Sequence, residues 1–278
     1  MFDTLVLSGG HIKGICHLGA LDYLYDNQLL KHIKQYVGTS IGSIISYLLI
    51  IGYTPLEIML EFCKSKYLDK MKIDIFNFIQ RKGAFSFSPI HEFLEHLTIK
   101  KIGILLTMKK LKDLFDKSLT CVTYNYTLHH IEYLNVETNP DMPCLTALRM
   151  SCNLPGIFED YFYNNHYYID GGVYESFPIS YVDVNTHKVI AISLNSDYSN
   201  NIMETDDDSI LVYFYKILNI PRQQVIKNTL TKVDVKKSLI IDISIEEINL
   251  LTFKPSLEDS YVLYNKGYEV AKLAWSEF

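Results

Sequence analysis

Two short motifs of the chain contain residues that could carry out nucleophilic catalysis. Gly38–Gly42, with the sequence GTSIG, fits the pattern G-x-S-x-G, in which a serine lies on a sharp turn between a strand and a helix. Small flanking residues let the backbone bend tightly and let a substrate approach the hydroxyl of Ser40. Asp170-Gly171-Gly172 places a carboxylate before a tight turn, and a carboxylate can remove a proton if its site tunes its pKa. Ser40 is therefore a candidate nucleophile, and Asp170 is a candidate base.

A glycine-rich segment, Ser8–Gly14 (SGGHIKG), follows the first apolar run and could hold negative charge. Gly9 and Gly14 have the separation of a P-loop, but the lysine and the serine or threonine that must follow are missing. A dinucleotide-binding loop needs a glycine where His11 stands. Two interpretations remain: a plain turn, or a loop whose backbone N–H groups stabilise an oxyanion formed during nucleophilic attack. In the second case Lys13 either adds positive charge or braces the loop.

A histidine base is the alternative to Asp170. On α/β-hydrolase sheets the usual order is serine, then an acid, then histidine, and only His187 follows a plausible acid late in this chain. The surrounding sequence NTHKV indicates a surface turn before a strand. Ser40 also comes early, because only one clear strand precedes its own, whereas the α/β-hydrolase turn normally follows several. The residues favour Asp170 and leave His187 as an alternative.

Alternating strands and helices predict an α/β fold in which a parallel sheet positions these motifs. Thr4–Ser8 and Gln35–Thr39 are short β-rich runs, and an apolar helical pattern follows each of them. Helix starts are indicated at Thr54-Pro55 and Ser88-Pro89. The other expected elements are strands at 119–124, 128–135, 188–194 and 239–243, helices at 41–51 and 143–152, a hairpin at 161–170 turning at Asn164-Asn165, a loop around KGAFSFSP, an acidic loop at 204–208, and a last helix capped by Ser256.

Composition narrows the classes of partner. The 278 residues are 48% hydrophobic with a net charge of −6, which indicates a globular protein and argues against nucleic acid as the main partner. Five cysteines without a CxxC pair predict unpaired thiols in a reducing compartment, and no zinc site. No signal peptide is visible at the N-terminus, and the most apolar run, Ile44–Ile51, is far shorter than the roughly 20 residues of a membrane span. We therefore expect a soluble, cytoplasmic protein. Because no linker interrupts the chain, we expect one domain over residues 1–278.

Taken together, the motifs resemble those of the patatin-like phospholipase family. That family has a glycine-rich [DS]GGGx[KR]G loop, a GxSxG turn soon after it and a later DG[GA], and Ser8–Gly14, Gly38–Gly42 and Asp170–Gly172 match them in this order. Thr107–Tyr124 is similar to the family's segment that leads into a central strand. Arg149–Phe158, RMSCNLPGIF, is similar to its ASxAxPxxF segment. The resemblance covers about residues 4–195.

The resemblance implies a three-layer α/β/α fold with a mostly parallel sheet and a catalytic dyad that contains no histidine. Ser40 would be the nucleophile and Asp170 the general base. Main-chain N–H groups around Gly9, Gly10 and His11 would form the oxyanion hole. The remaining matched residues would support the motifs: Lys13, Gly14, Gly38, Gly42, Gly171 and Gly172.

The chain departs from the family pattern at two places. His11 stands where the family usually has a third glycine, and a β-carbon is tolerated there only if the backbone does not need a positive φ. Ser151-Cys152-Asn153 is bulkier than the family's usual small residues.

The family resemblance implies a lipid acyl hydrolase of the phospholipase A or lysophospholipase type, which cleaves fatty-acyl esters of glycerophospholipids through an acyl-enzyme. Such an enzyme needs no metal or cofactor, is independent of calcium, and touches the membrane surface transiently. Helices between Thr54 and Leu97 and the stretch Tyr213–Ile220 are candidates for lipid access, although core positions are the simpler interpretation. The alternative function is a lipid- or partner-binding module that retains the fold without activity, and His11 keeps this alternative open.

Overall fold

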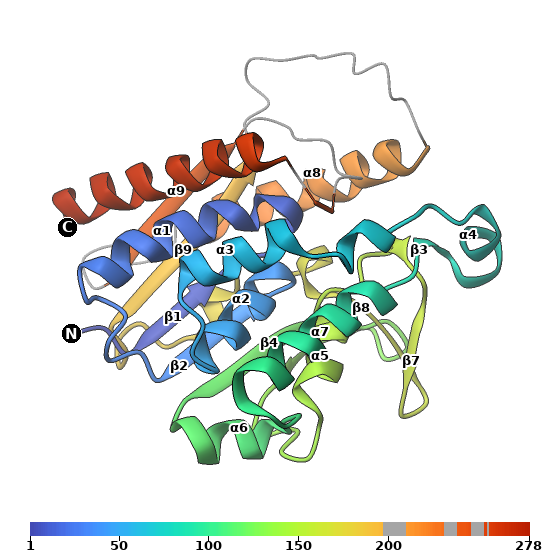
Figure 1. Ribbon diagram of the computed structural model, residues 1–278, viewed down its shortest axis with the longest axis horizontal. Coiled ribbons are helices and arrows are strands. Elements are labelled where there is room, and N and C mark those ends of the chain that lie inside the picture. The colour runs from blue at the N-terminus through green and yellow to red at the C-terminus, as the bar shows by residue number, and fades with distance from the viewer. Residues whose placement is uncertain (197–209, 231–237, 246–252, 255) are drawn as a thin grey trace.

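A central β-sheet carries helices on both faces (Figure 1). The computed structural model describes residues 1–196, 210–230, 238–245, 253–254 and 256–278, so the expected acidic loop at 204–208 lies outside the described residues. The strand order is β10-β9-β1-β2-β4-β8-β7, with β5 paired to β4 beside this path. Five neighbouring strands are parallel: β1 (Thr4–Leu7), β2 (Gln35–Thr39), β4 (Ser118–Asn125), β9 (Val189–Ser196) and β10 (Ser238–Ile245). The α/β fold with a mostly parallel sheet is thereby confirmed.

The other strands are antiparallel to their neighbours. β5 (His130–Leu134) and β8 (His166–Asp170) both pair with β4, and β7 (Tyr161–Tyr163) pairs with β8. The expected hairpin turns at Asn164 and Asn165, whose φ values of 46° and 65° suit a two-residue turn with left-handed backbone at both positions.

One expectation about the sheet was wrong. The segment around KGAFSFSP was expected to be a loop, but it contains β3 (Gly83–Phe85), which pairs in parallel with β6 (Gly156–Phe158). A β-carbon on Gly83 would lie 2.0 Å from the carbonyl oxygen of Phe158, so the pairing depends on the missing side chain. A three-residue strand specified by such a close approach leaves no periodic pattern in the sequence.

The alternation of side chains along each strand divides the core between the two faces. Leu5 and Leu7 on β1 point into the larger core, together with the helices of that face. Val6, between them, points to the opposite face and packs with Phe177 and with Ile226 of a helix late in the chain. This division gives the three layers that the resemblance implied.

Nine helices are described in the resolved ranges, several of them with clear start signals. Thr54 and Glu57 form a reciprocal capping box at the start of α3, and Ser256 accepts a hydrogen bond from the Asp259 N–H at the start of α9. The expected helix at Ser88 runs to Ile102, where Gly103 at φ 78° ends it. The helices are α1 (Gly14–Asp26), α2 (Ile41–Ile50), α3 (Pro55–Lys64), α4 (Ile75–Arg81), α5 (Ser88–Ile102), α6 (Met108–Phe115), α7 (Cys144–Ser151), α8 (Ile210–Leu230) and α9 (Leu257–Glu277).

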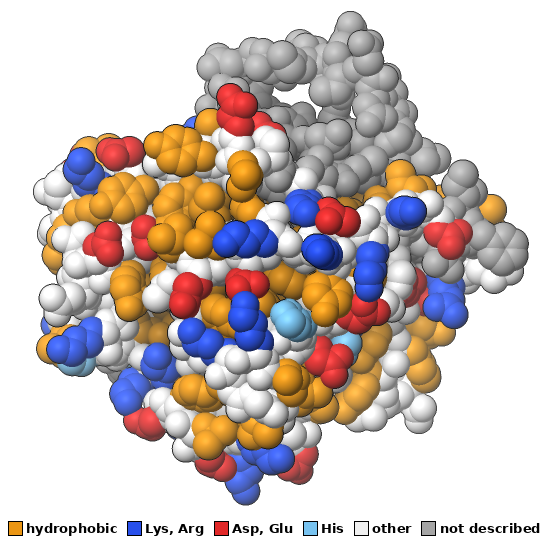
Figure 2. All heavy atoms as spheres, viewed as in Figure 1, with side chains coloured by type: hydrophobic (Ala, Val, Ile, Leu, Met, Phe, Trp, Pro, Cys, Tyr) orange, Lys and Arg blue, Asp and Glu red, His pale blue; other side chains and the backbone are white. Residues whose placement is uncertain are grey.

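The helices α1 and α9 lie side by side on one face, where Figure 1 draws them in blue and red. Two glycines allow this close approach. A β-carbon on Gly19 would lie 1.8 Å from the Tyr264 carbonyl oxygen, and one on Gly267 would lie 2.0 Å from that of Cys16. On the same face of the molecule, Figure 2 shows basic and acidic side chains mixed with separate hydrophobic areas.

Candidate active site

Ser40 lies on the sharp turn between β2 and α2 that its motif predicts. Its backbone has φ 55° and ψ −125°, a strained conformation for a residue with a side chain. The flanking glycines are sterically required, because a β-carbon on Gly38 would lie 2.5 Å from the Gly42 carbonyl carbon. A β-carbon on Gly42 would likewise lie 2.5 Å from the Leu7 carbonyl oxygen. The turn therefore holds the Ser40 side chain away from the sheet, at the end of β2.

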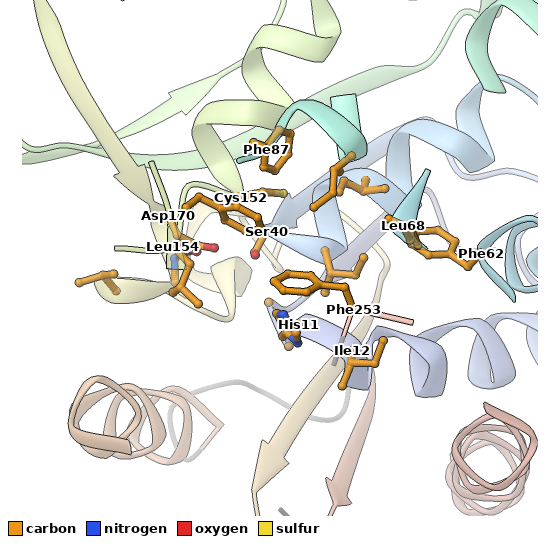
Figure 3. Close-up of a pocket in the computed structure, with 18 of the residues that line it drawn as sticks. His11, Ile12, Ser40, Phe62, Leu68, Phe87, Cys152, Leu154, Asp170 and Phe253 are labelled. Atoms are coloured by element: carbon orange, nitrogen blue, oxygen red, sulfur yellow. Dashed lines mark hydrogen bonds between the residues drawn. The ribbon is translucent and has the colours of Figure 1, made fainter. Parts of the chain in front are cut away.

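Strand β4 brings Asp170 to Ser40 because it pairs with both β2 and β8. Thr39, the last residue of β2, is opposite Val122, and Asp170, the last residue of β8, is opposite the next residue, Thr123. β2 runs parallel to β4 and β8 runs antiparallel to it, so the carboxyl ends of β2 and β8 approach one another. Figure 3 shows the two side chains pointing toward each other.

Asp170 is a buried carboxylate with a raised pKa. Its side chain accepts a hydrogen bond from the Gly172 N–H at 2.6 Å and interacts with the Ser40 hydroxyl. Burial raises the pKa of Asp170 to about 6, although the hydrogen bonds from Ser40 and Gly172 and the positive charge of Arg222 act to lower it. A carboxylate with this pKa is largely ionised at neutral pH and is a stronger base than an exposed aspartate.

The glycines after Asp170 let this turn pack against β4. A β-carbon on Gly171 would lie 2.4 Å from the Val122 carbonyl oxygen, and one on Gly172 would lie 2.9 Å from Oδ1 of Asp170. Any side chain at Gly171 would thus push Asp170 away from Ser40.

Ser151, at the end of α7, fixes the turn of Ser40 from beneath. Its hydroxyl accepts a hydrogen bond from the Ser40 N–H at 3.0 Å, donates to the Val122 carbonyl at 2.6 Å, and contacts the Ser43 hydroxyl at 2.9 Å. The sequence identified this position only as bulkier than is usual for the family. Its hydrogen-bonding role depends on β4 and α7 meeting at the turn, which no local pattern encodes.

Asn153 connects the same segment to Asp170. Its carbonyl accepts the Asp170 N–H at 2.9 Å, its side chain donates to the Tyr168 carbonyl at 2.7 Å, and its amide oxygen accepts from the buried Arg149 at 2.6 Å. Of the two polar residues beside Cys152, Ser151 thus holds Ser40 and Asn153 holds Asp170.

The glycine-rich loop lies beside Ser40, but its three expected N–H donors are not equivalent. The Gly9 N–H already donates to the Ser176 carbonyl at 2.8 Å. For the N–H groups of Gly10 and His11, no hydrogen-bond acceptor is found within the described part of the chain. Gly10 is required for space, because a β-carbon would lie 2.4 Å from Cδ1 of Leu194. The geometry favours Gly10 and His11 over Gly9 as donors to an oxyanion.

His11 adopts a positive φ of 52°, so the backbone does require the conformation that favours glycine at this position. Its ring packs edge-on against Phe253, with centroids 5.0 Å apart, and neither ring nitrogen has a partner among the described residues. Burial, with the nearby charges of Arg222 and Lys13, lowers the pKa of His11 to about 4, so the imidazole is neutral at pH 7. As Figure 3 shows, the ring lies next to Phe253 below Ser40.

Ser40 and Asp170 open into a largely apolar pocket with an empty volume of about 930 Å³, which includes its open mouth. Aromatic and aliphatic side chains from several helices form most of its wall (Figure 3). They are Ile12, Ile41, Ile44, Phe62, Leu68, Phe87, Ile90, Leu154, Phe158, Val173 and Phe253. The pocket can therefore accept a long apolar group next to Ser40.

Of the supporting residues in the glycine-rich loop, Gly14 allows the start of α1 to pack against the turn after Ser40. A β-carbon on Gly14 would lie 2.4 Å from Cγ1 of Ile41. Lys13 is buried, at 7% exposure.

The alternative base, His187, does not lie near Ser40. It precedes β9 and contacts Asp3 at 3.1 Å, beside the first residues of the parallel strands, whereas Ser40 follows the last residue of β2. The described residues contain no cluster of three or more His, Cys, Asp or Glu side chains that could hold a metal ion.

Arg222 is a pocket residue that the sequence interpretation missed. It lies on α8 and donates to the Gly9 carbonyl at 2.5 Å and to the Ser176 hydroxyl at 2.6 Å. A single arginine in an amphipathic stretch, 182 residues after Ser40, carries no local signal of this contact.

Comparison with known proteins identifies the family. The sequence model of the patatin-like phospholipases matches residues 5–183, which carry both motifs of the site and the glycine-rich loop. The chain belongs to the patatin-like phospholipase family. This family member is also 35% identical over 233 residues to the "Probable lipid hydrolase 463L" of Invertebrate iridescent virus 6. The match covers 79% of this chain and 76% of the viral protein.

Two solved structures share the fold of this patatin-like protein at low sequence identity. VipD from Legionella pneumophila has a TM-score of 0.61 and 15% identity, and the match covers 99% of this chain and 67% of VipD. ExoU from Pseudomonas aeruginosa has a TM-score of 0.53 and 15% identity, and this chain spans about half of it, 52%. Within the described residues, no single helix has both the length and the hydropathy to cross a membrane; α2 and α3 meet the criteria only jointly, with a bend of 119° between them.

Proposed function

We propose that this protein is a lipid acyl hydrolase that cleaves fatty-acyl esters of glycerophospholipids, as a phospholipase A or lysophospholipase, with Ser40 as nucleophile and Asp170 as base. The observation that carries the proposal is the buried Asp170 carboxylate, with its pKa raised to about 6, in contact with the hydroxyl of Ser40 at the floor of an apolar pocket. Family membership and the viral lipid hydrolase support the choice of lipid ester as substrate.

The mechanism follows from the positions of these groups. Asp170 accepts the proton of the Ser40 hydroxyl as its oxygen attacks the ester carbonyl, and the N–H groups of Gly10 and His11 stabilise the oxyanion. The protonated Asp170 then gives its proton to the departing alcohol, which leaves an acyl group on Ser40. A water molecule that Asp170 deprotonates releases the fatty acid by the reverse sequence.

The pocket wall suits the acyl chain of such a substrate. Its aromatic and aliphatic side chains exclude water from the ester and offer the apolar surface that a fatty acid buries. Since every step is assigned to protein groups, the proposal predicts that a calcium chelator leaves the activity unchanged.

A fluorophosphonate probe, which reacts only with an activated serine, tests this function together with product analysis. We expect the wild-type protein to be labelled and to release fatty acid from phosphatidylcholine vesicles. The variants Ser40→Ala and Asp170→Asn should lose both properties while keeping the fold. Labelling of a well-folded Ser40→Ala variant, or full activity of Asp170→Asn, would refute the dyad.

His11 favours one other function, that of a binding module without activity. Its β-carbon stands at a position of positive φ, and its ring occupies space beside the expected oxyanion hole. A folded wild-type protein that binds phosphatidylcholine vesicles but neither reacts with the probe nor releases fatty acid would establish that function instead.

A further inference from the structure

Arg222 joins the second half of the chain to the glycine-rich loop. It lies on α8, beyond residues 5–183 that the family model matches, and yet it lines the same pocket as Ser40 and Asp170. Its Nε donates to the Ser176 hydroxyl at 2.6 Å, and its terminal nitrogen donates to the Gly9 carbonyl at 2.5 Å. Hydrogen bonds from a charged donor are about twice as strong as neutral ones.

The segment at Ser176 holds the other side of Gly9. The Ser176 carbonyl accepts the Gly9 N–H at 2.8 Å, and the Ser176 side chain accepts from Arg222. Gly9, Ser176 and Arg222 thus form a closed set of hydrogen bonds, which we call the Gly9 clamp. A β-carbon on Gly9 would lie 3.3 Å from both Oγ of Ser176 and Cβ of Ser40, so the clamp lies directly against the turn of the nucleophile.

The planarity of the peptide bond transmits this clamp to the reaction site. In a trans peptide the carbonyl of one residue and the N–H of the next point in opposite directions, and none of the described peptide bonds is cis. When Arg222 fixes the Gly9 carbonyl, it therefore also fixes the direction of the Gly10 N–H. That N–H, with no acceptor among the described residues, points away from Arg222.

The positive charge of Arg222 supports the same role as its hydrogen bonds. A cation bound to the Gly9 carbonyl polarises the peptide and makes the Gly10 N–H a stronger donor to negative charge. The same cation lowers the pKa of Asp170 against the effect of burial. The other titratable groups in the pocket are neutral at pH 7, because burial lowers the pKa of His11 to about 4 and raises the pKa of the Cys152 thiol well above its usual value.

We infer that Arg222 is a positioning residue of the oxyanion hole: through the Gly9 clamp it holds the Gly9–Gly10 peptide so that the Gly10 N–H faces the ester carbonyl at Ser40. This inference rests on the proposed function. The segment beyond residue 183 is then part of the catalytic apparatus, and the site is incomplete without α8.

Steady-state kinetics on two esters tests the inference. One substrate, p-nitrophenyl butyrate, has no phosphate, and the other is phosphatidylcholine in vesicles. We expect Arg222→Met to lower kcat about 100-fold on both substrates while KM stays within about threefold, since the loss of one oxyanion donor costs about 10²–10³ in kcat. Lys227→Met removes an exposed cation from the same helix and should leave both constants unchanged.

Two milder variants separate positioning from a loss of folding. Arg222→Lys keeps the charge but not the two directed donors, and Ser176→Ala removes only the acceptor that orients the guanidinium. We expect each to lower kcat by roughly 5- to 20-fold, a fraction of the full loss that removing an oxyanion donor causes, with unchanged circular dichroism. Arg222→Met should also move the acid limb of the kcat/KM profile to higher pH, whereas Arg222→Lys should not, because Asp170 loses a nearby positive charge only in the former.

The outcomes distinguish this inference from its alternatives. A loss confined to phosphatidylcholine, with normal hydrolysis of p-nitrophenyl butyrate, would overturn positioning and show that Arg222 recognises the substrate phosphate. Full kcat on both esters in Arg222→Met would overturn the inference while leaving the proposed function intact. A wild-type protein that hydrolyses neither ester would refute the proposed function and the inference with it.

Discussion

The substitution Asp170→Asn should stabilise the protein while it abolishes the activity. The ionised carboxylate is buried, at 3% exposure, and its pKa rises from 3.8 to about 6 on folding. The folded protein therefore binds this proton more tightly than the unfolded chain does. The group's contribution to stability is fully present below pH 3.8 and is lost as the pH rises through 6.

The expected size follows from that shift. A displacement of about two pKa units corresponds to about 3 kcal/mol, so the neutral amide should raise the free energy of unfolding by about 3 kcal/mol at pH 8. At pH 5, where the unfolded chain is still ionised but the folded carboxyl is mostly protonated, the gain should fall to about 1.5 kcal/mol. Over the same range, loss of the general base should lower kcat by about 10²–10⁴-fold.

Unfolding in guanidinium chloride at pH 8 and pH 5, followed by circular dichroism, measures the two free energies. Asp242→Asn is the control for activity alone, because it removes a carboxylate from β10, outside the pocket, and should leave kcat unchanged. If Asp170→Asn were no more stable than the wild type at pH 8, or if its gain were the same at both pH values, the burial argument for the base would be wrong.

Four other expectations follow from the site and the core. The wild-type kcat/KM should fall about tenfold per pH unit below about pH 6, as Asp170 becomes protonated. His187→Ala should keep full kcat, because its partner Asp3 lies beside the first residues of the parallel strands; a large loss would restore the histidine base. Ser151→Ala should cost about 1–3 kcal/mol of stability and lower kcat, measured by denaturation and ester hydrolysis, since it strips the Ser40 N–H of its acceptor. Gly267→Ala should lower the melting temperature by more than 10 °C, as its β-carbon would collide with α1; an unchanged melting temperature would contradict that packing.

The parts of the fold that could be predicted are those encoded by local pattern. The strand before Gly9, the turn of Ser40 and the Asn164-Asn165 hairpin each combine an alternating or apolar run with residues that suit one backbone conformation. The pairing of β3 with β6 could not be predicted in the same way. It depends on a contact between distant segments, which the missing side chain of Gly83 makes possible.

The candidate site also contains residues that a local motif predicts and residues that only distant contacts bring together. The candidates Ser40 and Asp170 came from short motifs, whereas the groups that hold them, Ser151 and Arg222, have no motif of their own. His11 shows the limit most directly, because neither its φ of 52° nor its ring contact with Phe253, 242 residues later, has a local signal in the sequence. The residue types in the sequence identify which atoms could react, but contacts between distant segments determine how those atoms are oriented.

The meeting of β2 and β8 on β4 also has a consequence for how this protein acquires activity during folding. Ser40 and Asp170 are 130 residues apart, and Arg222 follows only after another 52, so the site consists of contacts with a large sequence separation. Such contacts carry the entropic cost of closing long loops, and chains rich in them fold slowly. A nascent chain that ends before α8 would lack part of the site, and a partly folded one would lack the β4–β8 pairing. Recovery of ester hydrolysis during refolding should therefore lag behind the recovery of helical circular dichroism, which makes turnover a probe of the last long-range contacts to form.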